Sequence, residues 1–95
     1  MAVAAGGQAW ELDLWRRLMQ GDERALEELY DQFASHIFGL AYRVTGDSRV
    51  AEDITVEVLA SAWADPGDFR PGTMPLRAFL SVKAHELAAE RVRAG

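Results

Sequence analysis

Three carboxylates close together form the first candidate binding site of this chain: Glu52, Asp53 and Glu57. Asp53 and Glu57 are four positions apart, so in a helix they project from the same face about one turn apart. Like charges at this spacing mildly destabilise a helix, and a cationic partner would neutralise them. The alternative is a solvated acidic face, which the helix dipole favours by about 0.3–1 kcal/mol per charge near the N-terminus. Spacing alone favours this alternative. If the carboxylates do form a site, they would bind a cationic partner through their charge.

A second candidate site combines aromatic and basic side chains in the C-terminal third of the chain. Capture of a single nucleic-acid strand needs an apolar or aromatic wall for an unstacked base and cations for the backbone. A Pro/Gly-rich loop at 65–74 offers Phe69 and Arg70 for this purpose. The cations that follow it are Arg77, Lys83, His85, Arg91 and Arg93. An ordinary connecting loop, with Phe69 folded onto the core, is an equally consistent alternative.

The sequence predicts neither an enzyme nor a metal or cofactor site. His36 and His85 lie on different predicted helices without a second ligand four residues away, and the chain has no cysteine. We expect His36 to be a half-buried polar residue. No Ser/His/Asp set and no nucleotide-binding glycine loop is present in the sequence.

Several features of the composition favour a cytoplasmic protein without membrane insertion. The lack of cysteine excludes disulfides and fits a reducing compartment. No apolar run approaches the ~20 residues that span a bilayer. The first nine residues lack the basic start and long apolar centre of a signal peptide.

Charge is distributed unevenly along the chain, whose formal net charge is -5. Residues 1–47 contain eight acids and four arginines, whereas residues 76–95 contain four basic residues and two acids. Phosphate contacts supply much of the affinity of a nucleic-acid-binding protein, so a nucleic-acid surface is expected only at the C-terminal end. The acidic remainder suits a protein partner with a basic docking surface.

The apolar periodicity predicts an all-α fold, a small bundle of about four helices with short connections. We expect helices at about 10–20, 22–44 and 49–64, and a fourth that begins at Pro75. The buried stripe expected for the second helix is Leu26, Leu29, Tyr30, Phe33, Ile37, Leu40, Ala41 and Val44. Phe38 and Tyr42 lie off this stripe and indicate a second contact face. Residues 1–9 are expected to form a flexible lead-in, and residues 10–95 one domain.

The third predicted helix resembles the second region of bacterial sigma factors of the extracytoplasmic-function (ECF) group. Members carry a pattern similar to Ala-Glu-Asp-x-x-Gln-Glu-Val-Phe-x-x-x-Trp, and residues 51–63 here read Ala-Glu-Asp-Ile-Thr-Val-Glu-Val-Leu-Ala-Ser-Ala-Trp. Val56 and Leu59 replace the usual Gln and Phe, and Trp63 is expected in the core. The resemblance implies docking of this helix on a coiled coil of the largest subunit of core RNA polymerase. The implied contacts are Glu52, Asp53, Val56, Glu57 and Leu59.

The resemblance continues through residues 75–80 to Arg93 and implies a second role for this end of the chain. In the family, the loop and the fourth helix capture the non-template single strand of the −10 promoter element, and anti-sigma factors are typical partners. Here His85 and Glu86 stand where members tend to have Arg and Asn. Two alternatives stay open: a sigma-like module that binds polymerase or an anti-sigma factor without reading DNA, and an unrelated helical bundle that dimerises through apolar stripes.

Overall fold

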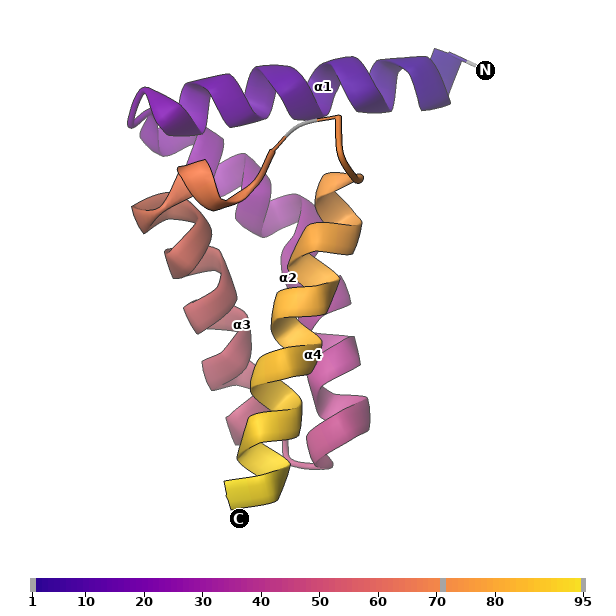
Figure 1. The fold of residues 1–95 in the computed structure, drawn as a ribbon, viewed down its shortest axis with the longest axis vertical. Helices are drawn as coiled ribbons and strands as arrows, with labels where there is room; N and C mark the ends of the chain where they lie inside the picture. The colour runs from indigo at the N-terminus through magenta and orange to yellow at the C-terminus, as the bar shows by residue number, and fades with distance from the viewer. Residues whose placement is uncertain (1, 71, 95) are drawn as a thin grey trace.

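In a computed structural model the chain is an α-helical bundle, which confirms the predicted all-α fold. The structure describes residues 2–70 and 72–94, and the side chains from residue 9 onward. The elements are α1 Ala2–Met19, α2 Glu23–Thr45, α3 Ser48–Ala64, the 3₁₀ turn η1 Pro66–Asp68 and α4 Leu76–Ala94. Helices α2, α3 and α4 pack side by side along one axis, with α3 antiparallel to the other two, and α1 crosses the end of the bundle where α4 begins (Figure 1).

Aspartates cap the starts of the second and third helices. The Asp22 carboxylate accepts a hydrogen bond from the amide of Arg24 at 2.9 Å, and Asp47 accepts from the amides of Arg49 and Val50 at 2.9 and 3.2 Å. Gly46 ends α2 in the left-handed region at φ 69°, where glycine meets no steric penalty. These local caps fix the turn between α2 and α3 within two residues of its predicted place.

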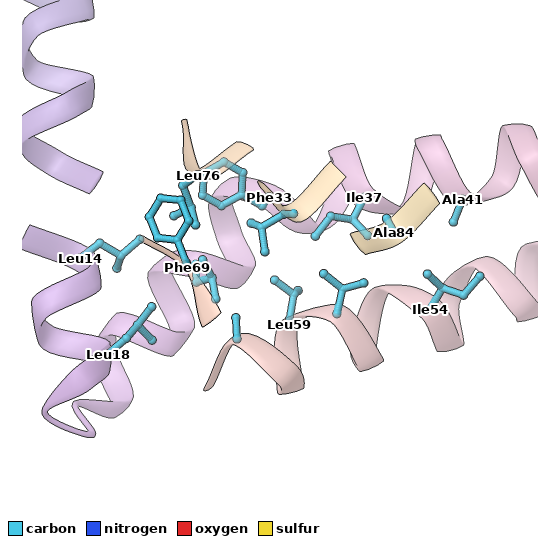
Figure 2. Close-up of a cluster of buried hydrophobic side chains, with 14 of the residues drawn as sticks. Leu14, Leu18, Phe33, Ile37, Ala41, Ile54, Leu59, Phe69, Leu76 and Ala84 are labelled. Carbon is cyan, nitrogen blue, oxygen red and sulfur yellow. The ribbon is translucent and has the colours of Figure 1, made fainter. Parts of the chain in front are cut away.

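The core lies where α2, α3 and α4 meet, and Leu14 and Leu18 of α1 with Phe69 of the loop continue it at one end (Figure 2). Helix α2 buries every fourth residue, namely Ala25, Leu29, Phe33, Ile37 and Ala41. The small alanines at both ends of this stripe let the neighbouring helices approach closely. The predicted stripe was broader, and its Tyr30 was wrong: that side chain is 49% exposed, because it lies at the edge of the contact with α3. Leu26, Leu40 and Val44 are only partly buried.

Helix α1 braces the end of the bundle. It begins at Ala2, eight residues before the predicted start, so the segment expected to be a flexible lead-in is helical over residues 2–9. Alanine is the strongest helix former, and four of these eight positions are alanine. The boundary of the domain at residue 10 stays a prediction. None of the helices described here is long and apolar enough to cross a membrane.

Two polar contacts tie α1 to the rest of the bundle. The Arg17 guanidinium donates to both carboxylate oxygens of Glu28 on α2, at 2.8 and 2.9 Å, and these bonds lower the pKa of Glu28. The Glu11 carboxylate accepts from the amide of Leu76 at 3.0 Å and so caps the first turn of α4.

Candidate functional site

The predicted acidic face is present on α3. Glu52, Asp53 and Glu57 are exposed, and Val56 beside them is 54% exposed. Leu59, predicted to share this surface, is 2% exposed and points into the core (Figure 2). It lies on the side of α3 that packs inward, so a docked partner would not touch it. The candidate protein-binding surface is therefore the acidic face without Leu59.

A shallow groove between α2 and α3 adjoins this acidic face. It is lined by Tyr30, Ala34, Ser35 and Phe38 from α2 and by Glu52 and Thr55 from α3. The rings of Phe38 and Tyr42 stack with their centroids 6.0 Å apart, which extends the aromatic surface along α2. The sequence indicated Phe38 and Tyr42 as a second contact face but missed Tyr30. The four-residue spacing of Tyr30, Ala34, Phe38 and Tyr42 was the available signal.

The loop aromatic, Phe69, belongs to the core. Its side chain is 3% exposed, and its ring centroid lies 4.8 Å from that of Trp15 and 5.1 Å from that of Phe79. This is the alternative in which the loop residue folds onto the core, and a base could stack on the ring only if the ring left its place. Arg70, the next residue, is exposed.

The predicted DNA-binding cations divide into two groups. Lys83 lies 3.6 Å from a carboxylate oxygen of Asp68 and above the ring of Phe79, and Arg91 bonds Glu57 at 2.7 Å. The Arg91–Glu57 pair joins a residue predicted to contact DNA with one predicted to contact polymerase. In the part of the chain that the structure describes, the other four cations are exposed and form no ion pair: Arg70, Arg77, His85 and Arg93.

A polar contact joins α2 to α4 at His36, which is half-buried as predicted. The Ser81 hydroxyl donates to the carbonyl oxygen of Arg77 at 2.7 Å, so its oxygen is free to accept the Nε2 hydrogen of His36, also at 2.7 Å. Burial lowers the pKa of His36, and the positive charges of Arg77 and Arg43 lower it further. The ring is therefore neutral near pH 7, with its hydrogen on Nε2 and none on Nδ1.

The family comparison decides what kind of domain carries these surfaces. The family described as Sigma-70 region 2 matches residues 29–95, which include most of α2 and all of α3 and α4. The chain belongs to the sigma-70 region 2 family. This confirms the resemblance drawn from residues 51–63, and it agrees with the expectation of a non-enzyme because sigma factors are not enzymes.

Curated relatives of this sigma region 2 domain come from mycobacteria. The chain is similar to the ECF RNA polymerase sigma factor SigK of Mycobacterium tuberculosis strain H37Rv, with 34% identity over 80 residues that cover 84% of this chain and 43% of the relative. SigK of Mycolicibacterium vanbaalenii is 33% identical over 84 residues, which cover 87% of this chain and 43% of that protein. The sigma domain thus spans less than half the length of these relatives. No solved structure gives a significant match.

Proposed function

We propose that this sigma region 2 domain acts in transcription initiation by docking on core RNA polymerase through the acidic face of α3. The observation that carries the proposal is the exposure of Glu52, Asp53, Val56 and Glu57 on one helix. The opposite face of this helix is buried, with Ile54, Val58 and Leu59 in the core. In the described residues Glu52 and Asp53 form no ion pair, and Glu57 is held by a single surface pair. Arg91 bonds only Oε1 of Glu57, so the other carboxylate oxygen can accept a cation of a basic partner surface while the pair with Arg91 persists.

The partner that the family implies is the coiled coil of the largest polymerase subunit, which would place the domain in the cytoplasm. Docking would present the loop at 65–75 and α4 to the melted −10 element, where the exposed Arg70, Arg77, His85 and Arg93 contact the non-template strand. Delivery by polymerase accounts for DNA contact by a chain of net charge -5, because the free domain would repel DNA at long range.

The test titrates the chain with an isolated coiled-coil fragment of the largest subunit. We expect Asp53→Ala/Glu57→Ala to weaken binding about tenfold or more, which corresponds to about 1.4 kcal/mol. The matched control is Glu23→Ala/Glu27→Ala, which removes two exposed acids at the same spacing from α2 and should change the affinity little. Equal losses in both variants would show that only net charge matters and would contradict docking through α3.

A second function has its own support: a sigma-like module bound by polymerase or an anti-sigma factor without reading DNA. Phe69 is buried, and Lys83 and Arg91 are paired with acids, so part of the predicted DNA surface is occupied within the chain. Replacing His85 by Arg and Glu86 by Asn separates the two functions. Under promoter reading, this variant bound to polymerase should hold −10 single-stranded DNA more tightly than the parent; unchanged binding favours the second function.

A further inference from the structure

The two flanks of α4 are occupied differently. The flank toward α3 and η1 carries Lys83 and Arg91, and acids of those two elements neutralise both. The opposite flank meets α2 through the contact between Ser81 and His36. Arg77, Ser81 and His85 succeed one another at four-residue spacing, so they line that second flank together. Its cations have no carboxylate partner in the described residues.

Helix α2 adds a cation that the sequence did not single out. Arg43 lies two turns beyond His36 on α2, and its charge acts on the His36 ring, as does that of Arg77. Helices α2 and α4 run in the same direction (Figure 1), so Arg77 lies on one side of the His36–Ser81 contact and Arg43 on the other. Arg43 also forms no ion pair among the described residues.

These residues form a basic strip, here called the α2–α4 strip and defined as His36, Arg43, Arg77, Ser81 and His85. Arg77 is four residues from Ser81 along α4, and Arg43 is seven residues from His36 along α2. At 1.5 Å per residue, the strip from Arg77 to Arg43 is about 16 Å long. A nucleic-acid strand carries several charges over this length, at about 3.4 Å per phosphate in B-form geometry. Two arginine forks suit phosphate oxygens better than any other side chain.

We infer that the α2–α4 strip is the path of the DNA backbone, and that it binds consecutive phosphates of a single strand through Arg77, His36 and Arg43. The inference rests on the proposed function, because polymerase must bring the strand to the domain. It moves the backbone contacts away from Lys83 and Arg91, which are paired, and adds His36 and Arg43 to them. Glu86, which follows His85, is not part of this strip.

Strand binding on the strip is coupled to a proton at His36. The charged groups that face this ring are Arg43 on its own helix and Arg77 on α4, with His85 one turn beyond Ser81. Burial is the largest cause of the lowered pKa of His36, and the charges of Arg77 and Arg43 add to it. Phosphates that neutralise the two arginines remove this second cause and bring negative charge close to the ring. Nδ1 then takes up a proton while Nε2 keeps its hydrogen bond to Ser81. Because the bound state takes up a proton, binding tightens as the pH falls toward and below the ordinary histidine pKa of about 6.5.

The first experiment measures how the affinity for single-stranded DNA depends on salt. The chain bound to core RNA polymerase is titrated with a mixed-sequence oligonucleotide of about 12 nucleotides. Each lost phosphate contact on a single strand reduces the slope of log K against log salt by about 0.7, so Arg43→Gln/Arg77→Gln should reduce it by about 1.4. The control, Lys83→Gln/Arg91→Gln, removes the same charge from the other flank and should leave the slope nearly unchanged.

The outcomes separate this inference from the proposed function. If the chain formed no complex with core RNA polymerase, the proposed function would be overturned. If the complex formed but bound no oligonucleotide, the strip would be overturned and docking through α3 would stand. If it bound and the two double variants lost equal slope, or only the control variant lost slope, the strip alone would be overturned and docking through α3 would stand. Circular dichroism should show both variants folded, because Arg43 and Arg77 are exposed and unpaired in the described residues and the control loses only two surface ion pairs.

A second measurement follows the His36 ring by NMR in the free chain at low salt, with the oligonucleotide at a concentration high enough to replace delivery by polymerase. Adding the oligonucleotide should raise the pKa of His36, and inorganic phosphate should do so only at a phosphate concentration at least about tenfold higher, since several linked phosphates bind together. No change with the oligonucleotide would overturn the inference. Equal midpoints for the two ligands would also overturn it, because the strip would then be a site for free anions.

Discussion

The two flanks of α4 differ less in charge than in what surrounds the charge. Toward α3, Lys83 and Arg91 meet Asp68 and Glu57, and the loop above them is anchored by buried Phe69. Toward α2, Arg77 lies near a neutral histidine and another arginine, so its charge stays available to a ligand. The comparison teaches that a count of basic residues along a helix does not locate a binding surface. The neighbouring helices decide which cations are already neutralised.

The largest expected effect tests the anchoring of the flank toward α3. Phe69→Ala removes a buried ring that packs on Trp15 and Phe79, and we expect the free energy of unfolding to fall by about 3–5 kcal/mol. Urea denaturation measures this loss. The exposed neighbour serves as the control, because Arg70→Ala should change stability by less than about 0.5 kcal/mol. A loss below about 1 kcal/mol for Phe69→Ala would mean that the loop is not anchored through this ring.

A smaller effect is expected where the other flank meets α2. Ser81→Ala leaves the Nε2 hydrogen of half-buried His36 without its acceptor, which should cost about 1 kcal/mol. The control is Ser61→Ala, since Ser61 is exposed on α3. If both serine variants unfolded at the same urea concentration, the contact between α2 and α4 would contribute nothing to stability.

The smallest effect is a difference in proton binding between the flanks. The pKa of His36 is lowered in the folded chain, so the unfolded chain binds more protons just below pH ~6.5 and stability falls as the pH drops through that range. Arg43→Gln/Arg77→Gln should raise the pKa of His36 and flatten this dependence. Lys83→Gln/Arg91→Gln should leave it unchanged. NMR titration of the His36 ring checks both variants. The same pKa of His36 in the parent and in both double variants would contradict the distinction between the flanks.

Much of the fold could be predicted because its signals are local. Asp22, Gly46 and Asp47 set helix ends through bonds to residues two to four positions away, and the apolar periodicity gave the helices between them. The start of α1 was placed too late, because a short alanine-rich segment carries no apolar stripe and no cap. The acidic face of α3 was predictable for the same local reason, since one helix presents all of its members.

The rest of the candidate site depends on contacts between distant segments. His36 and Ser81 are 45 positions apart, and Glu57 and Arg91 are 34 apart, so no spacing rule could pair them. Leu59 was misplaced because the family pattern gives its residue type but not the side of α3 that packs inward. Phe69 was ambiguous for a related reason: an aromatic residue in a Pro/Gly loop can fill a core or face solvent, and the position of α1 decides between them.

The cap that Glu11 provides to α4 couples α1 to the first turn of the last helix. The amide of Leu76 donates to a residue 65 positions earlier in the sequence, on α1, which packs across the end of the bundle. When α1 lifts away, the first turn of α4 loses that bond, and the loop loses Trp15 as the neighbour of Phe69. Local opening at the N-terminus therefore spreads to the start of the helix that carries the basic strip, and the amides at the two places should exchange their hydrogens together.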